Sequence, residues 1–135
     1  MLVGMTSYTL TREVPRPFDD VLAEVRAGLV EQGFGVISEI DLAGTLHAKL
    51  GVEVPPQVIL GACRPQLAHQ ALQADPSVAA MLPCNVVVRS TGPSECVVEA
   101  FDPDTMVTMT GGAPALALVA TDARARLLGL LDALA

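Results

Sequence analysis

Apolar residues recur at two different spacings along the first part of this chain, and each change of spacing marks an element. Alternation of apolar and polar residues over residues 5–14 predicts a half-exposed strand. Apolar residues then fall at helical spacing over residues 18–30, which predicts an amphipathic helix that Gly33 is placed to end. A second strand is predicted over residues 34–40.

The middle of the chain predicts two helices on either side of a buried strand. Asp41 is a suitable N-cap for a short helix over residues 42–50, whose leucines fall one turn apart. Residues 58–62 are apolar throughout, which predicts a strand in the interior of a sheet. Because proline suits the first turn of a helix, a third helix is predicted to begin at Pro65 and to end at Asp75, with a partly helical turn after it.

The last third of the chain predicts a hairpin followed by helix. Two apolar runs over residues 84–89 and 95–101 are joined by a short connection that contains Gly-Pro, which is typical of a hairpin. Residues 105–110 predict a helical turn, and a long apolar face predicts a final helix from Pro114 to the end of the chain. The pattern therefore predicts one α+β domain over residues 1–135, with about five strands, a long first and last helix, and extra short helices.

Composition and charge narrow the classes of protein to which the chain can belong. Eight basic and fifteen acidic side chains give a formal charge of −7, the wrong sign for holding a phosphate backbone, so nucleic-acid binding is excluded. No window approaches the ~20 apolar residues that span a bilayer, and the N-terminus lacks a signal-peptide pattern. We therefore expect no membrane association and a cytoplasmic location. The three cysteines, an odd number, do not make a disulfide framework.

The segment between Cys63 and Cys84 is the strongest candidate for a site. If the two strands that it joins are antiparallel, the end of the first and the start of the second share one edge, where both sulfurs would be neighbours. Cys63 lies before a helix N-terminus and next to Arg64, and both features favour a thiolate. Asn85 could orient a ligand or satisfy local backbone groups. The alternative is that both cysteines are small buried hydrophobes.

A metal site would need more ligands than two thiols, and the sequence offers few. Thiolate and imidazole are the usual zinc ligands, so Cys63, Cys84 and His69 are the candidates. No CxxC or HxxxH occurs, and periodicity places His69 and His47 on the solvent side of their helices. Phosphate loops, nucleophile elbows and dinucleotide fingerprints are absent from the sequence. The sequence therefore indicates no particular cofactor, and whether the chain is an enzyme stays open.

Three stretches, GFGVISEIDLAGTLHAKLG, VILGACRPQLAHQAL and LPCNVVV, resemble the domain of unknown function 302 family of small bacterial and archaeal proteins. The most specific pieces are Gly61-Ala62-Cys63 with Pro65, Leu82-Pro83-Cys84-Asn85, and the Asp102-Pro103 turn. The resemblance covers almost the entire chain. It implies a β-α-β4-α order, an antiparallel sheet with helices packed against it, and a homodimer. It implies no activity.

Three hypotheses of function remain open at the level of sequence. The first is a cleft that binds a small apolar or thiol-reactive molecule at Cys63, Arg64, Cys84 and Asn85. The second is a thiol redox or metal-handling protein that uses Cys63 and Cys84, with His69 as a further ligand. The third is a non-catalytic dimerisation module whose interface is the C-terminal helix or an edge strand.

Overall fold

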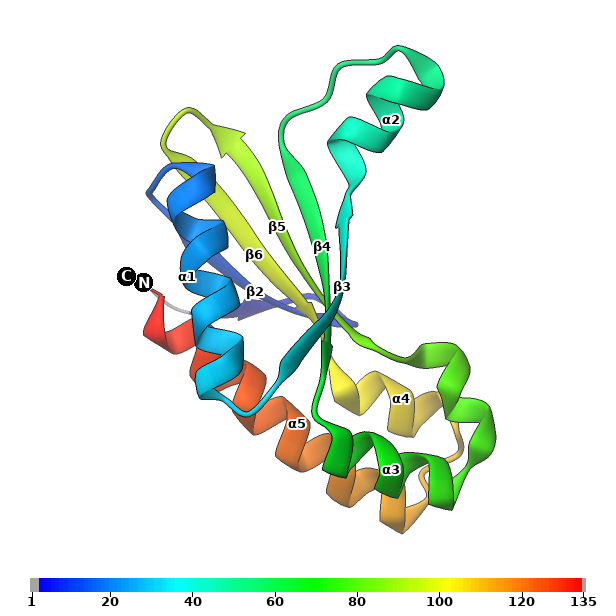
Figure 1. Ribbon diagram of the computed structural model, residues 1–135. Helices are drawn as coiled ribbons and strands as arrows, with labels where there is room; N and C mark the ends of the chain where they lie inside the picture. The colour runs from blue at the N-terminus through cyan, green and yellow to red at the C-terminus, as the bar shows by residue number, and fades with distance from the viewer. Residues whose placement is uncertain (1–2, 135) are drawn as a thin grey trace.

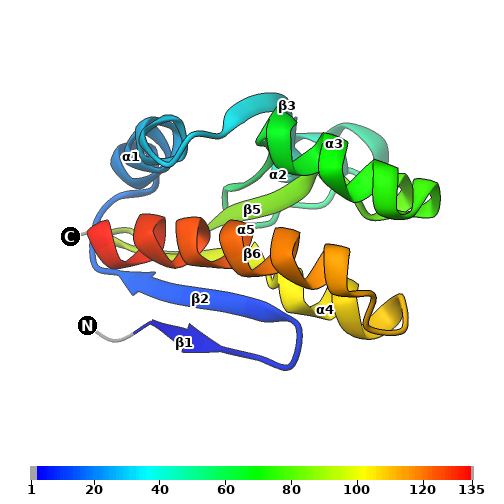
Figure 2. The same ribbon diagram turned by 90° about the horizontal axis from the view of Figure 1, so that it is seen from below.

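The computed structural model describes residues 3–134, which form one antiparallel sheet with the first and last helices packed on one of its faces (Figures 1 and 2). The six strands lie in the order β1-β2-β6-β5-β4-β3, and every neighbouring pair is antiparallel. In chain order the elements are β1 Gly4–Met5, β2 Thr9–Val14, α1 Phe18–Glu31, β3 Gly35–Asp41, α2 Leu42–Leu50, β4 Gln57–Cys63, α3 Pro65–Ala74, the 3₁₀ helix η1 Pro76–Met81, β5 Cys84–Gly92, β6 Glu95–Phe101, α4 Pro103–Met109 and α5 Pro114–Ala133. The predicted α+β class and antiparallel sheet are confirmed.

A row of apolar side chains crosses four neighbouring strands and holds them in register. Leu10 of β2 pairs with Ala100 of β6, Ala100 with Val86 of β5, and Val86 with Leu60 of β4. All four side chains are fully buried. Because alternate residues of a strand face opposite sides, a slip of one residue on any of these strands would expose its member of the row. The row therefore fixes how the ends of β4 and β5 meet.

Helix α1 covers this row because its apolar positions recur on one side of the helix. Val21, Val25 and Leu29 are fully buried against the sheet. The helix ends as predicted at Gly33, whose φ of +85° is in the left-handed region that glycine adopts without strain. The N–H of Phe34 then donates to the carbonyl of Leu29 at 2.9 Å, which closes the last turn.

The stretch predicted as one strand over residues 5–14 is two strands, so the sheet has six strands instead of five. The Thr6 hydroxyl accepts hydrogen bonds from the N–H groups of Tyr8 and Thr9, at 3.3 and 3.0 Å, which turns the chain back on itself. β1 then pairs with β2 as a hairpin. The alternation of residue types continues through the turn, so periodicity alone gave no sign of it.

Helix α2 has the predicted bounds and the predicted cap, but it buries none of its residues. The Asp41 carboxylate accepts from the N–H of Gly44 at 2.9 Å. Its leucines do not form a buried stripe, and Leu50 is 68% exposed. Figure 1 shows the reason, since α2 lies on an arm between β3 and β4 that extends away from the other helices.

The last helix is shorter than predicted within the part of the chain that can be described. The sequence predicts a helix from Pro114 to the end, whereas α5 ends at Ala133, and residue 135 lies outside the described residues. None of the helices within residues 3–134 is long and apolar enough to cross a membrane. α5 instead buries its apolar side against the sheet and against α3 and α4.

Candidate functional site

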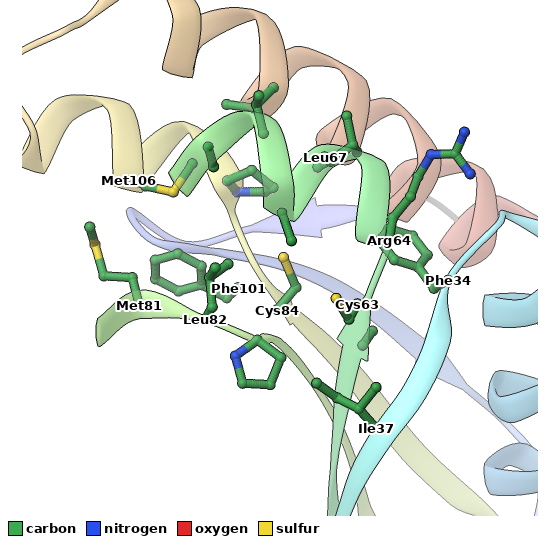
Figure 3. Close-up of a pocket in the computed structure, with 18 residues that line it drawn as sticks. Phe34, Ile37, Cys63, Arg64, Leu67, Met81, Leu82, Cys84, Phe101 and Met106 are labelled. Atoms are coloured by element: carbon green, nitrogen blue, oxygen red, sulfur yellow. The ribbon is translucent and has the colours of Figure 1, made fainter. Parts of the chain in front are cut away.

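A pocket of about 330 Å³ lies where β4 and β5 meet α3, α4 and α5 (Figure 3). The sheet contributes Ala62, Cys63 and Cys84 to its wall. The helices contribute mainly apolar side chains, among them Leu67, Ala71, Met106, Val119 and Ala123. We call it the inter-cluster pocket, because it separates two groups of buried apolar residues.

These two groups make up the buried interior. The larger, the sheet cluster, joins α1 and the C-terminal half of α5 to the strands. The smaller, the helical cluster, joins α3, η1, α4 and the N-terminal half of α5 through Leu67, Ala71, Val78, Met106, Leu116, Val119 and Ala123. Residues of both clusters line the inter-cluster pocket, so the pocket occupies the place where the two would otherwise pack together.

Small side chains explain why this space stays open. Five alanines line the pocket, and they lie on β4, α3 and α5: Ala62, Ala68, Ala71, Ala120 and Ala123. Interiors are normally packed as densely as organic crystals, so methyl groups at five wall positions leave volume that leucines would fill. No local pattern in the sequence marks these alanines as part of a site.

The close approach of Pro83 to β4 positions the two strand ends. Gly61 has no side chain at the point where the Pro83 ring crosses β4, and a Cβ there would lie 2.8 Å from the ring Cγ and would also collide with the Ser38 hydroxyl. Pro83 leads directly into β5, where Cys84 pairs with Ala62. Glycine at position 61 therefore permits the approach that brings the two cysteines together.

Cys63 and Cys84 both line the inter-cluster pocket, and both are half-buried free thiols. Cys63 is the last residue of β4, one position beyond the residue that pairs with Cys84. Figure 3 shows both sulfurs at the floor of the pocket, below α3. The structure thus brings these two predicted site residues to the same end of the sheet.

Burial raises the pKa of the Cys84 thiol above its ordinary value, and the neighbouring Cys63 raises it further. Burial disfavours the thiolate because the charge is removed from water, and a second thiolate beside it adds repulsion. Cys96 lies elsewhere, with its sulfur 3.4 Å from the Arg16 carbonyl oxygen. Burial raises the pKa of Cys96 too, against the lowering effect of the Arg16 charge.

Arg64 lines the pocket with its hydrocarbon stem, while its guanidinium points away from the two sulfurs (Figure 3). Its Nη1 lies 3.4 Å from the carbonyl oxygen of Gly33, and Nη1 of Arg126 donates to the carbonyl of Gln32 at 2.8 Å. The last turn of α1 has no basic residue of its own. The two arginines therefore provide the positive charge that favours a helix C-terminus.

Asn85 and His69 do not line the inter-cluster pocket. Asn85 is exposed and lines a separate hollow with Met81, Pro83 and Phe101. His69 is exposed on α3 and is not part of the pocket wall. Over residues 3–134 no group of three or more His, Cys, Asp or Glu side chains is arranged to hold a metal ion.

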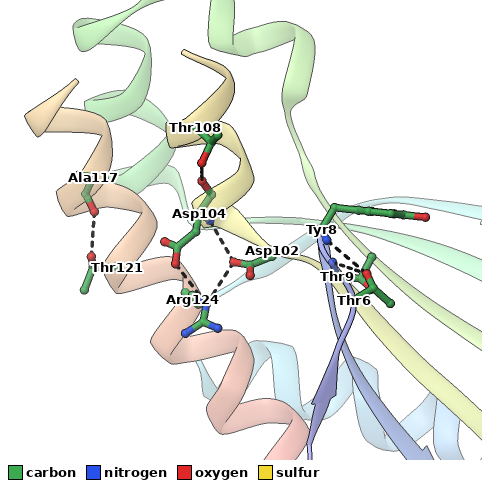
Figure 4. Close-up of polar contacts among 9 residues, drawn as sticks. All are labelled: Thr6, Tyr8, Thr9, Asp102, Asp104, Thr108, Ala117, Thr121 and Arg124. Carbon is green, nitrogen blue, oxygen red and sulfur yellow. Dashed lines mark hydrogen bonds and ion pairs between the residues drawn. The ribbon is translucent and has the colours of Figure 1, made fainter. Parts of the chain in front are cut away.

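A buried carboxylate fixes the wall that α4 provides (Figure 4). Asp102 accepts from the N–H of Asp104 at 3.0 Å and so caps α4, which begins at Pro103 and not at the predicted residue 105. The same carboxylate accepts from Nε of Arg124 on α5 at 3.2 Å, and the N–H of Asp102 donates to the Tyr8 carbonyl at 2.8 Å. These contacts of Asp102 together join α4, α5 and the turn between β1 and β2.

The fold and this site define a class of protein: an antiparallel α+β domain with an apolar pocket at one end of its sheet. Residues 10–134 match the family described as Domain of unknown function DUF302, and the chain belongs to this family. Its fold is similar to the crystal structure of an uncharacterized conserved protein DUF302 from Bacillus stearothermophilus, with 28% sequence identity and a TM-score of 0.86. That similarity covers 96% of this chain and 100% of the other. No curated protein matches the chain.

We predict that Cys84 is alkylated with a pH midpoint above the ordinary thiol pKa of about 8.5, because burial and Cys63 both disfavour its thiolate. Replacing Cys63→Ala removes the repelling charge and moves this midpoint down. Site-resolved mass spectrometry after iodoacetamide treatment at a series of pH values measures both effects. The pH midpoint of alkylation does not depend on how easily the reagent reaches the thiol, whereas the rate of alkylation does. A Cys84 midpoint below that of a free cysteine, or one unmoved by Cys63→Ala, would contradict the account.

Proposed function

We propose that this protein binds a small, neutral, apolar molecule in the inter-cluster pocket. The observation that carries the proposal is a volume of about 330 Å³ between two apolar clusters. This volume lies within the range of pockets that bind small molecules, which are concave and mostly lined by apolar side chains. A ligand there would contact both clusters and so take the place of the missing packing.

The polarity of the pocket wall favours a neutral ligand over a charged one. Arg64 is the one charged residue among those that line it, and its guanidinium is directed to Gly33. An ion in the pocket would lose its hydration without gaining a partner charge, which costs far more than the transfer of an apolar group. The thiols of Cys63 and Cys84 offer weak hydrogen bonds or covalent contact to a ligand.

The proposed setting is the cytoplasm. Cys63, Cys84 and Cys96 are all free, and a reducing compartment keeps thiols in this form. In the proposal the protein acts by binding, and no reaction is assigned to it.

We expect Ala68→Leu to weaken ligand binding, since Ala68 lines the pocket from α3 and a larger side chain there takes up part of its volume. The probe is N-phenyl-1-naphthylamine, a neutral apolar fluorophore whose emission rises on leaving water. Wild-type protein should bind it with one saturable site, and Ala68→Leu should lower the affinity at least about tenfold, or about 1.4 kcal/mol. Fluorescence titration measures the affinity.

The matched control is Ala74→Leu, the same change at an exposed position of the same helix that does not line the pocket. It should leave the affinity unchanged. Thermal unfolding of all three proteins checks that each is folded, and the probe should raise the melting temperature of wild type and Ala74→Leu. Equal affinities for both variants, or a wild type that gives no saturable signal, would overturn the proposal.

A second candidate function, homodimerisation, is favoured by the edge of the sheet at β3. All seven residues of β3 are exposed, whereas the opposite edge, β1, has two residues. Six large apolar residues are exposed over this strand and the arm that follows it: Val36, Ile37, Ile40, Leu50, Val52 and Val54. Long exposed edges invite pairing with another strand. An antiparallel pair of β3 strands is self-complementary, as a two-fold dimer requires, so the proposed partner is a second copy of this chain.

We expect wild-type protein to be a dimer in solution and Ile40→Glu to be a monomer. In the dimer the added carboxylate would be buried against β3 of the second protomer, which carries the same charge. Ile40 lies on β3, and Leu118→Glu on α5 is the control at another exposed apolar residue. Light scattering after gel filtration gives the mass of each. A wild-type monomer at high concentration, or dissociation by both substitutions alike, would exclude this interface.

A further inference from the structure

We infer that Cys63 and Cys84 form a dithiol site that captures trivalent arsenic bearing an apolar substituent, as a neutral complex in the inter-cluster pocket. This inference goes beyond the binding of an apolar molecule, because it depends on the two sulfurs and not on the volume alone. It uses the same pocket, so its test must separate the two.

The two thiols lie next to the same cavity. Cys84 begins β5 and Cys63 ends β4, the neighbouring strand, and Cys63 lies close enough to raise the pKa of the Cys84 thiol. Both line one pocket, and Figure 3 shows both sulfurs at its floor. The third cysteine, Cys96, is buried and lies outside the pocket wall. Two thiols that face one cavity can bind a single thiol-seeking atom through two bonds.

The pocket offers two ligands, which are too few for a zinc ion. Zinc in proteins takes four ligands, or three and a water. Within residues 3–134 no third His, Cys, Asp or Glu completes a group with these thiols, and His69 is exposed outside the pocket. Soft thiolates select soft metals and metalloids. A soft centre that is satisfied by two sulfurs and one carbon fits the groups present.

The apolar wall of the pocket favours a neutral complex over a charged one. A monovalent cation such as Cu(I) held by two thiolates leaves a net negative complex, which an apolar wall does not stabilise. The guanidinium of Arg64 is directed to the Gly33 carbonyl and does not offset such a charge. An arsenic atom with one organic substituent and two sulfurs is neutral. Burial also keeps Cys84 protonated at neutral pH by raising its pKa, which matches a reaction that starts from two thiols.

The capture step balances without a redox partner. With phenylarsine oxide as the reactant, each sulfur forms one As–S bond and the As–O bond breaks. Both thiol protons go to that oxygen, which leaves as one water molecule. Arsenic stays trivalent and both sulfurs stay in the thiol oxidation state. The phenyl group then lies among the apolar residues of the pocket, such as Leu67 and Met106.

The test is titration of the reduced, full-length protein with phenylarsine oxide, followed by intact mass spectrometry and by competition with a small dithiol. Wild type should gain the mass of one reagent less one water, with an adduct that a monothiol does not reverse. Cys63→Ala and Cys84→Ala should each lower the affinity about 100-fold or more, since the second bond is then lost. Cys96→Ala should leave the affinity unchanged.

A second measurement on wild type covers the case in which a variant fails to fold. Bound phenylarsine oxide should protect Cys63 and Cys84 from alkylation and leave the labelling of Cys96 as it was. No adduct on wild type, protection that includes Cys96, or full affinity in either pocket variant would overturn the inference. Saturable binding of N-phenyl-1-naphthylamine without arsenical capture would overturn the dithiol site alone. Arsenical capture that needs both cysteines, without binding of that probe, would overturn the apolar-ligand proposal alone.

Discussion

The buried row that runs from Leu10 through Ala100 and Val86 to Leu60 is the constraint on which the rest of the structure depends. It sets the register of four strands, because a one-residue slip would turn buried side chains to solvent. That register places Cys84 opposite Ala62 at the end of the sheet. The same end is where the chain leaves for α3 and where it returns from η1, so the helical cluster is built beyond the row and not on top of it.

The interior is divided into the sheet cluster and the helical cluster because the second is built beyond the end of the sheet. α5 is long enough to take part in both clusters, and it links them on one side. Asp102 and Arg124 hold α4 to α5, and this contact stabilises the outer wall of the pocket. Alanines on the facing walls leave the space between unfilled. A ligand in that space would complete a core that the chain itself leaves incomplete.

Much of the fold was predictable from the sequence, and the exceptions have physical causes. Periodicity predicted the bounds of α2, the end of α1 at Gly33, and the hairpin of β5 and β6. It failed at Thr6, where a side-chain hydroxyl closes a turn without interrupting the alternation. It placed the leucines of α2 one turn apart, but none of them is buried, because the helix lies on an arm that extends away from the other helices. Spacing reports which side of an element is apolar, and not whether another element covers it.

The site could be predicted in part. The connection from one strand end to the next strand start predicted that Cys63 and Cys84 would be neighbours, whereas the alanines and methionines of the wall come from five separate elements and carry no local pattern. The central claim is that apolar ligands bind between the two clusters. Methyl NMR of methionine-labelled protein during titration with N-phenyl-1-naphthylamine tests it most directly, because Met81 and Met106 line the pocket and Met5 is 62% exposed elsewhere. The account predicts saturable shifts of the Met81 and Met106 methyl signals with Met5 unmoved; shifts confined to Met5, or none at saturating probe, would contradict it.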